Sequence, residues 1–157
     1  MYYIELFENL FKEKVKYLIV GGLAVNLYGI PRVTMDVDLI ISLKMENLDK
    51  LRKVLLELNY KSIYPDIDFI VPRLIDNWIK ERNMFAFSFK NFNEPYKQID
   101  ILLPFSKDFN YYWENRVERK INNITIYLIS KNDLIKIKEK SQRIQDKKDL
   151  ELLKKIK

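Results

Sequence analysis

The chain of 157 residues has the length of one domain, and its 48% apolar and 32% charged residues indicate a globular protein rather than a disordered one. Cysteine and histidine are both absent, which excludes disulfides, thiolate or imidazole metal sites, cysteine nucleophiles and proton transfer through a histidine. The net charge of +6 favours a polyanionic partner such as RNA or a nucleotide, although a composition rich in lysine, isoleucine and asparagine explains it equally well.

The apolar pattern predicts alternating helices and strands within one domain over residues 1–157. The expected helices cover residues 3–14, 23–28 and 46–59, a segment opened by Pro72, and a C-terminal pair over about 130–157 with Ser130 as N-cap. The expected strands cover residues 17–20, 36–42, 85–89, 98–103 and 121–129, the last one preceded by a turn at Asn122-Asn123. Residues 60–71 favour neither state. This order is typical of a mixed α/β (α+β) domain in which helices flank a central mixed β-sheet.

The sequence contains no candidate membrane anchor. Its apolar stretches are far shorter than the roughly 20 residues that span a bilayer. The N-terminus has neither the basic nor the apolar segment of a signal peptide. We therefore expect a cytoplasmic protein with no membrane partner.

Two aspartates on the predicted strand 36–42 are the first candidates for chemistry. Side chains alternate along a strand, so Asp36 and Asp38 project from the same face. Two neighbouring carboxylates repel each other unless a cation lies between them. A divalent metal is the simplest such cation, and pairing with surface lysines is the alternative. With only oxygen ligands available, the expected metal is Mg²⁺ or Mn²⁺.

The three glycines of the chain lie within nine residues, just before this strand. Gly21 and Gly22 stand where a strand gives way to a helix, and Gly29 ends that helix. Backbone without side chains can approach a phosphate, and the start of the helix offers unpaired N–H groups to an anion. The segment therefore predicts the phosphate site and the metal site of a nucleoside triphosphate.

A third carboxylate completes the expected site. Asp100 is the only acidic residue of the apolar strand 98–103, where a carboxylate is costly in a core but useful at a metal. Two-metal phosphoryl or nucleotidyl transfer generally needs such an additional ligand. We therefore predict Asp36, Asp38 and Asp100 as catalytic residues and as ligands of two metal ions.

These features together resemble the DNA polymerase β-like nucleotidyltransferase superfamily, which pairs a Gly-Gly turn with an Asp-x-Asp strand and a later lone aspartate. Two further segments narrow the resemblance. Residues 29–38 resemble the G-x-x-R-x-T-x-D-x-D element of small bacterial nucleotidyltransferases, and residues 133–149 resemble their D-L-I-x-x-K…R-x-x-D-x-x-D element. That group includes the toxins of abortive-infection type IV systems (AbiEii-like), and the resemblance covers residues 17–153.

The resemblance implies a nucleotidyltransferase fold that moves a nucleoside monophosphate from an NTP such as ATP to an RNA (for example tRNA), a protein or a small molecule. It also implies a toxin role with an antitoxin partner. Nucleotide-binding residues would be Gly21, Gly22, Arg32, Thr34, Lys138 and Arg143, with Asp146 in a supporting position. Each assignment has an alternative. Arg32 and Thr34 could be ordinary residues of an edge strand, and Lys138 and Arg143 could lie on a solvated helix face. The protein as a whole could be a non-catalytic member of this fold that binds RNA or a protein.

Two other features of the sequence favour ordinary structural roles. A second Asp-x-Asp, Asp66 to Asp68, follows Pro65 without a preceding glycine pair, so we interpret it as solvated surface. The aromatic residues of 85–92 and 111–113 could stack on bases, but alternating aromatic residues on a strand more often belong to a core.

Overall fold

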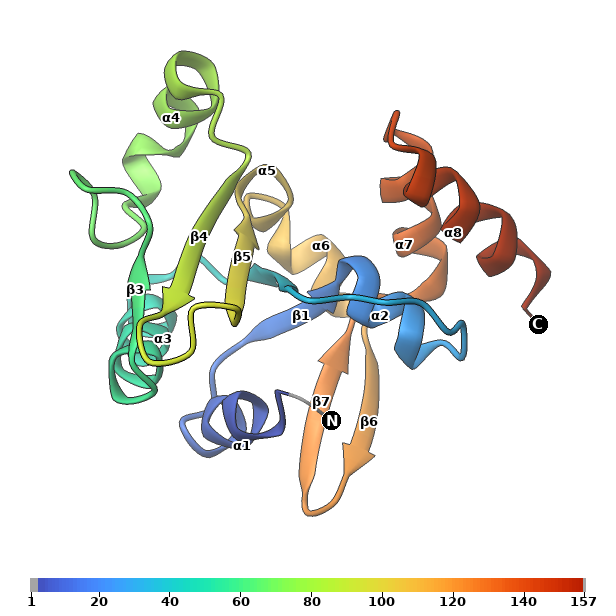
Figure 1. Ribbon diagram of the computed structural model, residues 1–157, viewed down its shortest axis with the longest axis horizontal. Helices are drawn as coiled ribbons and strands as arrows, with labels where there is room; N and C mark the ends of the chain where they lie inside the picture. Colours follow the sequence, from blue (N-terminus) through green and yellow to red (C-terminus); the bar gives the residue numbers. More distant parts are fainter. Residues whose placement is uncertain (1–2, 157) are drawn as a thin grey trace.

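The computed structural model describes residues 3–156 and contains a seven-stranded mixed sheet flanked by helices (Figure 1). The predicted mixed α/β class is confirmed. The helices are α1 (Ile4–Lys12), α2 (Gly21–Leu27), α3 (Met45–Glu57), α4 (Ile75–Arg82), α5 (Leu103–Ser106), α6 (Phe109–Glu114), α7 (Lys131–Glu139) and α8 (Ile144–Lys155), with a short 3₁₀ turn, η1 (Pro72–Leu74). The strands are β1 (Tyr17–Val20), β2 (Val37–Ile41), β3 (Tyr60–Ser62), β4 (Ala86–Asn91), β5 (Gln98–Leu102), β6 (Val117–Ile121) and β7 (Ile124–Leu128).

The strand order β3-β4-β5-β2-β1-β7-β6 places β2 between β5 and β1 at the centre of the sheet. The β2–β5 and β1–β7 pairs are parallel, and the other pairs are antiparallel. Asp38 of β2 lies opposite Asp100 of β5 on one side and opposite Val20 of β1 on the other. The register therefore brings the end of β1, where Gly21 follows, next to the carboxylates of β2 and β5.

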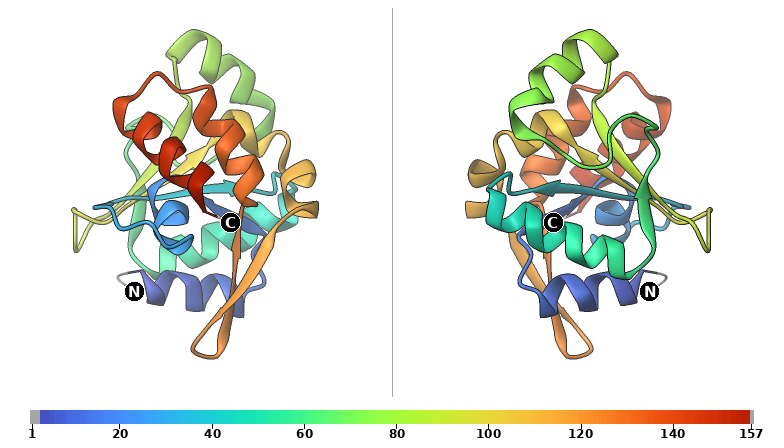
Figure 2. Two further views of the ribbon diagram at one scale, coloured as in Figure 1. Left: turned by 90° about the vertical axis from the view of Figure 1, so that its right-hand side faces the viewer. Right: turned by 90° about the vertical axis from the view of Figure 1, so that its left-hand side faces the viewer.

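Helices cover both faces of the sheet. Figure 2 shows α1 and α3 on one side, and α7 and α8 packed together on the other. The central strands are apolar because both of their faces are covered, and all four residues of β1 are buried. Amphipathic α1 and α3 contribute buried side chains to this core: Leu6, Phe7, Leu10, Leu48, Leu51, Val54 and Leu55.

The aromatic residues divide between core and surface. Phe87 and Phe89 of β4 are buried, with ring centroids 5.1 Å apart, as expected for a core. Phe85, Phe92 and Tyr111 are more than half exposed. The core interpretation is therefore confirmed for the alternating pair on β4 and wrong for these three.

Several predicted boundaries were wrong, each for a local reason. Helix α2 begins at Gly21 rather than at residue 23, because the glycine pair forms its first turn. The predicted strand 121–129 begins too early: its strand part is β7, and Ile121 is the last residue of β6, which pairs with β7 in a hairpin that turns at Asn122 (φ +56°). β6 escaped prediction because its Val-Glu-Arg-Lys-Ile sequence is that of a charged edge strand. Helix α5 lies outside the predicted pattern: Pro104, which directly follows the predicted strand 98–103, lies in the first turn of a helix.

Two further short elements lie outside the predicted pattern. Strand β3 forms within the segment 60–71 and occupies the edge of the sheet next to β4. Helix α6 contains the whole aromatic segment 111–113. Within residues 3–156, no helix combines the length and apolar character that crossing a membrane requires.

Candidate active site

The predicted carboxylates come together at the centre of the sheet. Asp38 lies in β2, Asp36 directly precedes that strand, and Asp100 is the parallel partner of Asp38 in β5. Burial and then the Asp100 carboxylate raise the pKa of Asp36 above its ordinary value. Burial, followed by Asp100 and Asp36, raises the pKa of Asp38 to about 7. These shifts indicate that the three acidic groups share one site and repel each other.

Two polar side chains hold Asp100 in place. Ser88 lies opposite Asp100 in the β4–β5 register, and its Oγ donates to Asp100 Oδ1 at 2.6 Å. Gln98 Nε2 donates to the same oxygen at 2.9 Å. Neither Ser88 nor Gln98 was among the residues predicted for the site. The available signal for Ser88 was one polar residue between two phenylalanines on an otherwise apolar strand.

The donor set suits a hard divalent cation, because all three side chains offer carboxylate oxygens. Burial and the neighbouring acids raise the pKa of Asp36 and of Asp38 by more than the nearby basic groups lower it. Among residues 3–156, no three acidic side chains are already grouped closely enough to hold an ion. Binding one therefore requires the carboxylates to turn towards a common point.

The glycine pair makes room for the side chains of the site itself. Gly21 has φ +63°, and a Cβ atom there would lie 2.0 Å from Asp38 Oδ2. A Cβ atom on Gly22 would lie 2.8 Å from Thr34 Oγ1 and 3.1 Å from Arg32 Cζ. A side chain at either position would therefore force the site's own side chains to shift, and the approach of a phosphate to this turn stays a prediction.

A network of ion pairs joins the segment before β2 to the C-terminal helices. The Arg32 guanidinium contacts the Asp149 carboxylate of α8. Lys138 Nζ of α7 lies 3.0 Å from Asp149 Oδ2 and 2.9 Å from Asp146 Oδ1. Ser141 Oγ donates to Asp146 Oδ2 at 2.6 Å. Burial acts to raise the pKa of Asp146, but the hydrogen bonds from Ser141 and Lys138 outweigh it and hold that pKa below its usual range.

This network reaches the carboxylates of the sheet through its basic members. Arg143 and then Lys138 act to lower the pKa of Asp38, against the stronger effect of burial. Lys138 is only 4% exposed, so the alternative of a solvated helix face is wrong for this residue, and its role in nucleotide binding stays a prediction. Arg143 is 78% exposed, with its Nε 3.9 Å from Asp146 Oδ2. Thr34 Oγ1 donates to the backbone carbonyl of Asp36 at 3.3 Å.

Asp149 is the charged residue of this network that the sequence pattern did not assign to the site. Its spacing of three residues from Asp146 places both carboxylates on the same side of α8. Asp149 is 1% exposed, whereas Asp146 is 14% exposed. The motif itself was visible in the sequence, but the contact with Arg32 joins residues 117 positions apart.

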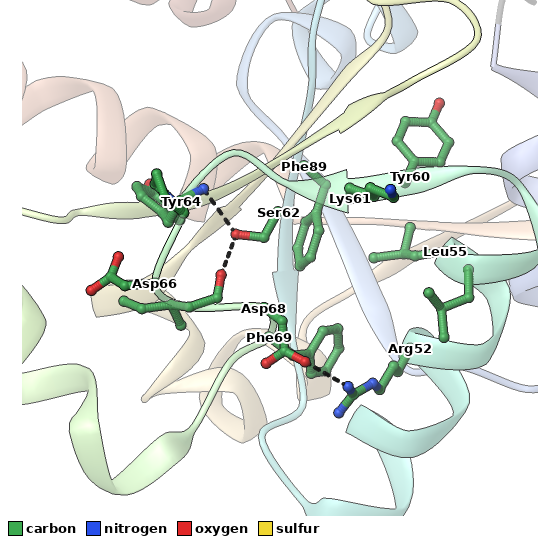
Figure 3. Close-up of a pocket in the computed structure, with 13 residues that line it drawn as sticks. Arg52, Leu55, Tyr60, Lys61, Ser62, Tyr64, Asp66, Asp68, Phe69 and Phe89 are labelled. Carbon is green, nitrogen blue, oxygen red and sulfur yellow. Dashed lines mark hydrogen bonds and ion pairs between the residues drawn. The ribbon is translucent and has the colours of Figure 1, made fainter.

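A separate cavity of about 410 Å³ lies between α3, β3 and the loop that follows β3 (Figure 3). Its wall includes Phe89, whose side chain points away from the face of β4 that carries Ser88. The second Asp-x-Asp lies at this cavity, where Asp66 pairs with Arg82 and Asp68 pairs with Arg52. Asp66 and Asp68 are 63% and 84% exposed, which confirms the prediction of solvated surface.

Comparison with solved structures defines the class of fold. The lincosamide antibiotic adenylyltransferase LnuA, in its lincomycin-bound crystal structure, matches with a TM-score of 0.60 and 20% identity over 99% of this chain and 94% of that chain. An antigenic nucleotidyltransferase-like protein from Paracoccidioides brasiliensis matches with a TM-score of 0.59 and 19% identity over 94% and 71%. The chain therefore has the fold of nucleotidyltransferases.

The sequence places the chain in one family of that class. Residues 4–156 match the family described as nucleotidyltransferase of unknown function (DUF6036), and the chain belongs to it. No curated protein matches. The superfamily resemblance is thereby confirmed, while the narrower resemblance to abortive-infection toxins stays a prediction.

Proposed function

We propose that this protein transfers a nucleoside monophosphate from an NTP to an acceptor hydroxyl and releases pyrophosphate, in a reaction that depends on a divalent metal. The observation that carries the proposal is the register of β2 against β5, which sets Asp38 opposite Asp100, with Asp36 directly before β2. Cationic side chains from the C-terminal helices lie close enough to act on the same carboxylate. Membership of a nucleotidyltransferase family supports the reaction class.

The carboxylates have separate tasks in this proposal. Asp36 and Asp38 would hold Mg²⁺ or Mn²⁺, two ions in the expected stoichiometry, and Asp100 would complete the set. When bound, the metal supplies positive charge that offsets the phosphate oxygens and the charge developing on them. Ser88 and Gln98 both donate to Asp100 Oδ1. We therefore assign acceptance of the proton from the attacking hydroxyl to Asp100 Oδ2.

The basic side chains would bind and orient the triphosphate. Arg32 lies beside the Gly21-Gly22 turn, and Lys138 and Arg143 lie near Asp38. Guanidinium and ammonium groups held at fixed positions stabilise the charge that develops as pyrophosphate leaves. Thr34, whose hydroxyl lies at the same turn, would help to fix the approach of the phosphates to the backbone.

We propose a small hydroxylated molecule as the first acceptor class to test. The support is the likeness in fold to a lincosamide adenylyltransferase over nearly the whole length of both chains. RNA, including tRNA, is the second class, because residues 130–157 contain ten Lys or Arg and only five Asp or Glu. The toxin role with an antitoxin partner belongs to this second class.

A labelling experiment tests the reaction and sorts the acceptors. The protein is incubated with each of the four α-³²P-labelled NTPs, with Mg²⁺ or Mn²⁺, and separately with a small-molecule extract, total RNA and total protein. We expect label to enter one acceptor pool only when metal is present, and we expect Asp36→Asn and Asp38→Asn to abolish it. Unimpaired transfer by both variants would contradict the assignment, and metal-independent RNA binding without transfer would favour a non-catalytic protein.

A further inference from the structure

Asp149 is the most buried charged residue of the polar network. Its carboxylate on α8 accepts hydrogen bonds from three side chains on different parts of the chain. Arg32 comes from the segment before β2, Lys138 comes from α7, and Gln145 Nε2 lies one turn earlier on α8 at 2.9 Å from Asp149 Oδ1. One anionic group therefore orders two cations from separate segments.

The surroundings of these two cations explain why they need such a partner. The Arg32 side chain is 18% exposed and that of Lys138 is 4% exposed. A charge that is removed from water is costly unless a counter-ion with good geometry faces it. Asp146 also contacts Lys138. Within residues 3–156, however, only Asp149 is seen to form ion pairs with both cations.

Both cations also face the proposed nucleotide site. Arg32 Cζ lies 3.1 Å from the position that a Cβ atom of Gly22 would occupy, so its guanidinium lies against the glycine turn. Lys138 Nζ lies 3.0 Å from Asp149 Oδ2, the same oxygen that the Arg32 guanidinium contacts, so the two cations share one carboxylate beside that turn. A lysine side chain has four rotatable carbon–carbon bonds and is poorly ordered without an anchor. The contact with Asp149 removes that freedom and aims the ammonium group.

We propose that Asp149 is a positioning residue for the triphosphate. It holds Arg32 and Lys138 at the glycine turn and beside the carboxylates, so that their charges are in place before the nucleotide binds. This inference rests on the proposed function, because it assigns Asp149 a role in the binding of that substrate. A competing account makes Asp149 only a strut that docks α8 onto the sheet.

Leu153 offers the matched control for the strut account. It lies one turn beyond Asp149 on α8, is fully buried and is part of the apolar core. Leu153→Ala weakens the docking of α8 without changing any charge or hydrogen bond of the network. Asp149→Asn keeps the shape of the side chain and removes its charge. If Asp149 acts only as a strut, the two variants should affect nucleotide binding in proportion to their loss of stability.

The test combines isothermal titration calorimetry with urea unfolding of the whole protein. The titrants are Mg²⁺–ATP and Mg²⁺–tripolyphosphate, the second of which isolates recognition of the phosphates. We expect Asp149→Asn to raise the Kd of both titrants about tenfold or more, in the range that residues supporting a charged site contribute. Leu153→Ala should lower stability but change Kd by less than about twofold, because its apolar side chain makes none of the hydrogen bonds or ion pairs that hold the two cations.

Two further variants keep the test decisive. Gln145→Ala removes one hydrogen bond to Asp149 from a half-buried position, and it should raise Kd about threefold, a typical value for such a bond. If Asp149→Asn does not fold, this variant decides the matter, and an unchanged Kd would overturn the inference. In an Arg32→Ala background, the effect of Asp149→Asn on Kd should shrink, because part of what Asp149 orders is absent.

The possible outcomes distinguish a failure of the proposed function from a failure of the positioning role of Asp149. A wild-type protein that binds neither titrant overturns the proposed function and this inference together. A wild-type protein that binds Mg²⁺–ATP, with unchanged Kd in folded Asp149→Asn, overturns the positioning role alone. Values of Kd that follow the loss of stability in both Asp149→Asn and Leu153→Ala would support the strut account and equally contradict the inference.

Discussion

Replacing Gly21 by alanine tests how closely the backbone turn and the carboxylate site depend on each other. The residue has φ +63°, where a side chain costs about 1–2 kcal/mol. The new Cβ atom would also lie 2.0 Å from Asp38 Oδ2. Because Cβ contacts below 3.0 Å are essentially never found, the carboxylate has to withdraw by about an ångström.

That displacement should affect activity more than stability. A misplacement of about 1 Å in a catalytic constellation can reduce the rate about a hundredfold. Gly29→Ala is the matched control, because Gly29 has φ +96° and nothing within 4 Å of a Cβ atom there. Both variants should lose stability through backbone strain, whereas only Gly21→Ala should also lose nucleotidyl transfer by about two orders of magnitude.

The assays are urea unfolding, which gives the free energy of unfolding, and the rate of label transfer at saturating NTP. Equal transfer rates for Gly21→Ala and wild type would refute the argument that Asp38 must stay beside the glycine. Equal losses of transfer in Gly21→Ala and Gly29→Ala would show that general destabilisation, rather than the carboxylate, is responsible.

Four further predictions follow from single contacts. In the absence of metal, the pKa of Asp38 near 7 means that ionising this carboxyl destabilises the folded state. The free energy of unfolding of the wild type, compared with that of Asp38→Asn, should therefore fall from pH 4 to pH 7, by at most roughly 1.4 kcal/mol per pH unit. Parallel pH curves for the two proteins would contradict this. Lys138→Met leaves two carboxylates without their shared cation and should cost about 3–5 kcal/mol in urea unfolding, with a loss below about 1 kcal/mol as the contrary result. Ser88→Ala frees Asp100 Oδ1 from its 2.6 Å contact and should slow transfer about tenfold with little loss of stability, and an unchanged rate would refute its role. Asp66→Ala and Asp68→Ala remove exposed ion pairs, so each should leave transfer unchanged and stability within about 1 kcal/mol; a loss of transfer would implicate the separate cavity.

The sequence predicted those parts of the fold that depend on local patterns. The apolar runs at 17–20 and 36–42 correspond to β1 and β2, because a strand covered on both faces needs continuous apolar residues. The elements that escaped prediction have weak local signals. Strand β3 has three residues, and β6 consists largely of charged residues that suit an edge. Their strand state is set by pairing with β4 and β7 rather than by their own composition.

The candidate site likewise contains residues that the sequence identifies and contacts that it does not. Asp36, Asp38 and Asp100 could be found because alternation along a strand and a lone acid among apolar residues are visible in the sequence. The reason for Gly21 was not visible, since it depends on the antiparallel pairing that sets Val20 opposite Asp38. The ion pair between Arg32 and Asp149 spans 117 residues, and no local pattern specifies it.

The most direct test compares the fate of the α-phosphate with that of the γ-phosphate of the same NTP. In parallel reactions with the acceptor pool that accepts label, the NTP carries ³²P at either the α- or the γ-phosphate, and wild type is compared with Asp38→Asn. For the wild type, we predict that α-label enters the acceptor and that γ-label appears only in pyrophosphate. With Asp38→Asn, we predict no label in either product. Entry of γ-label into the acceptor, or equal transfer by the variant, would contradict nucleotidyl transfer at these carboxylates.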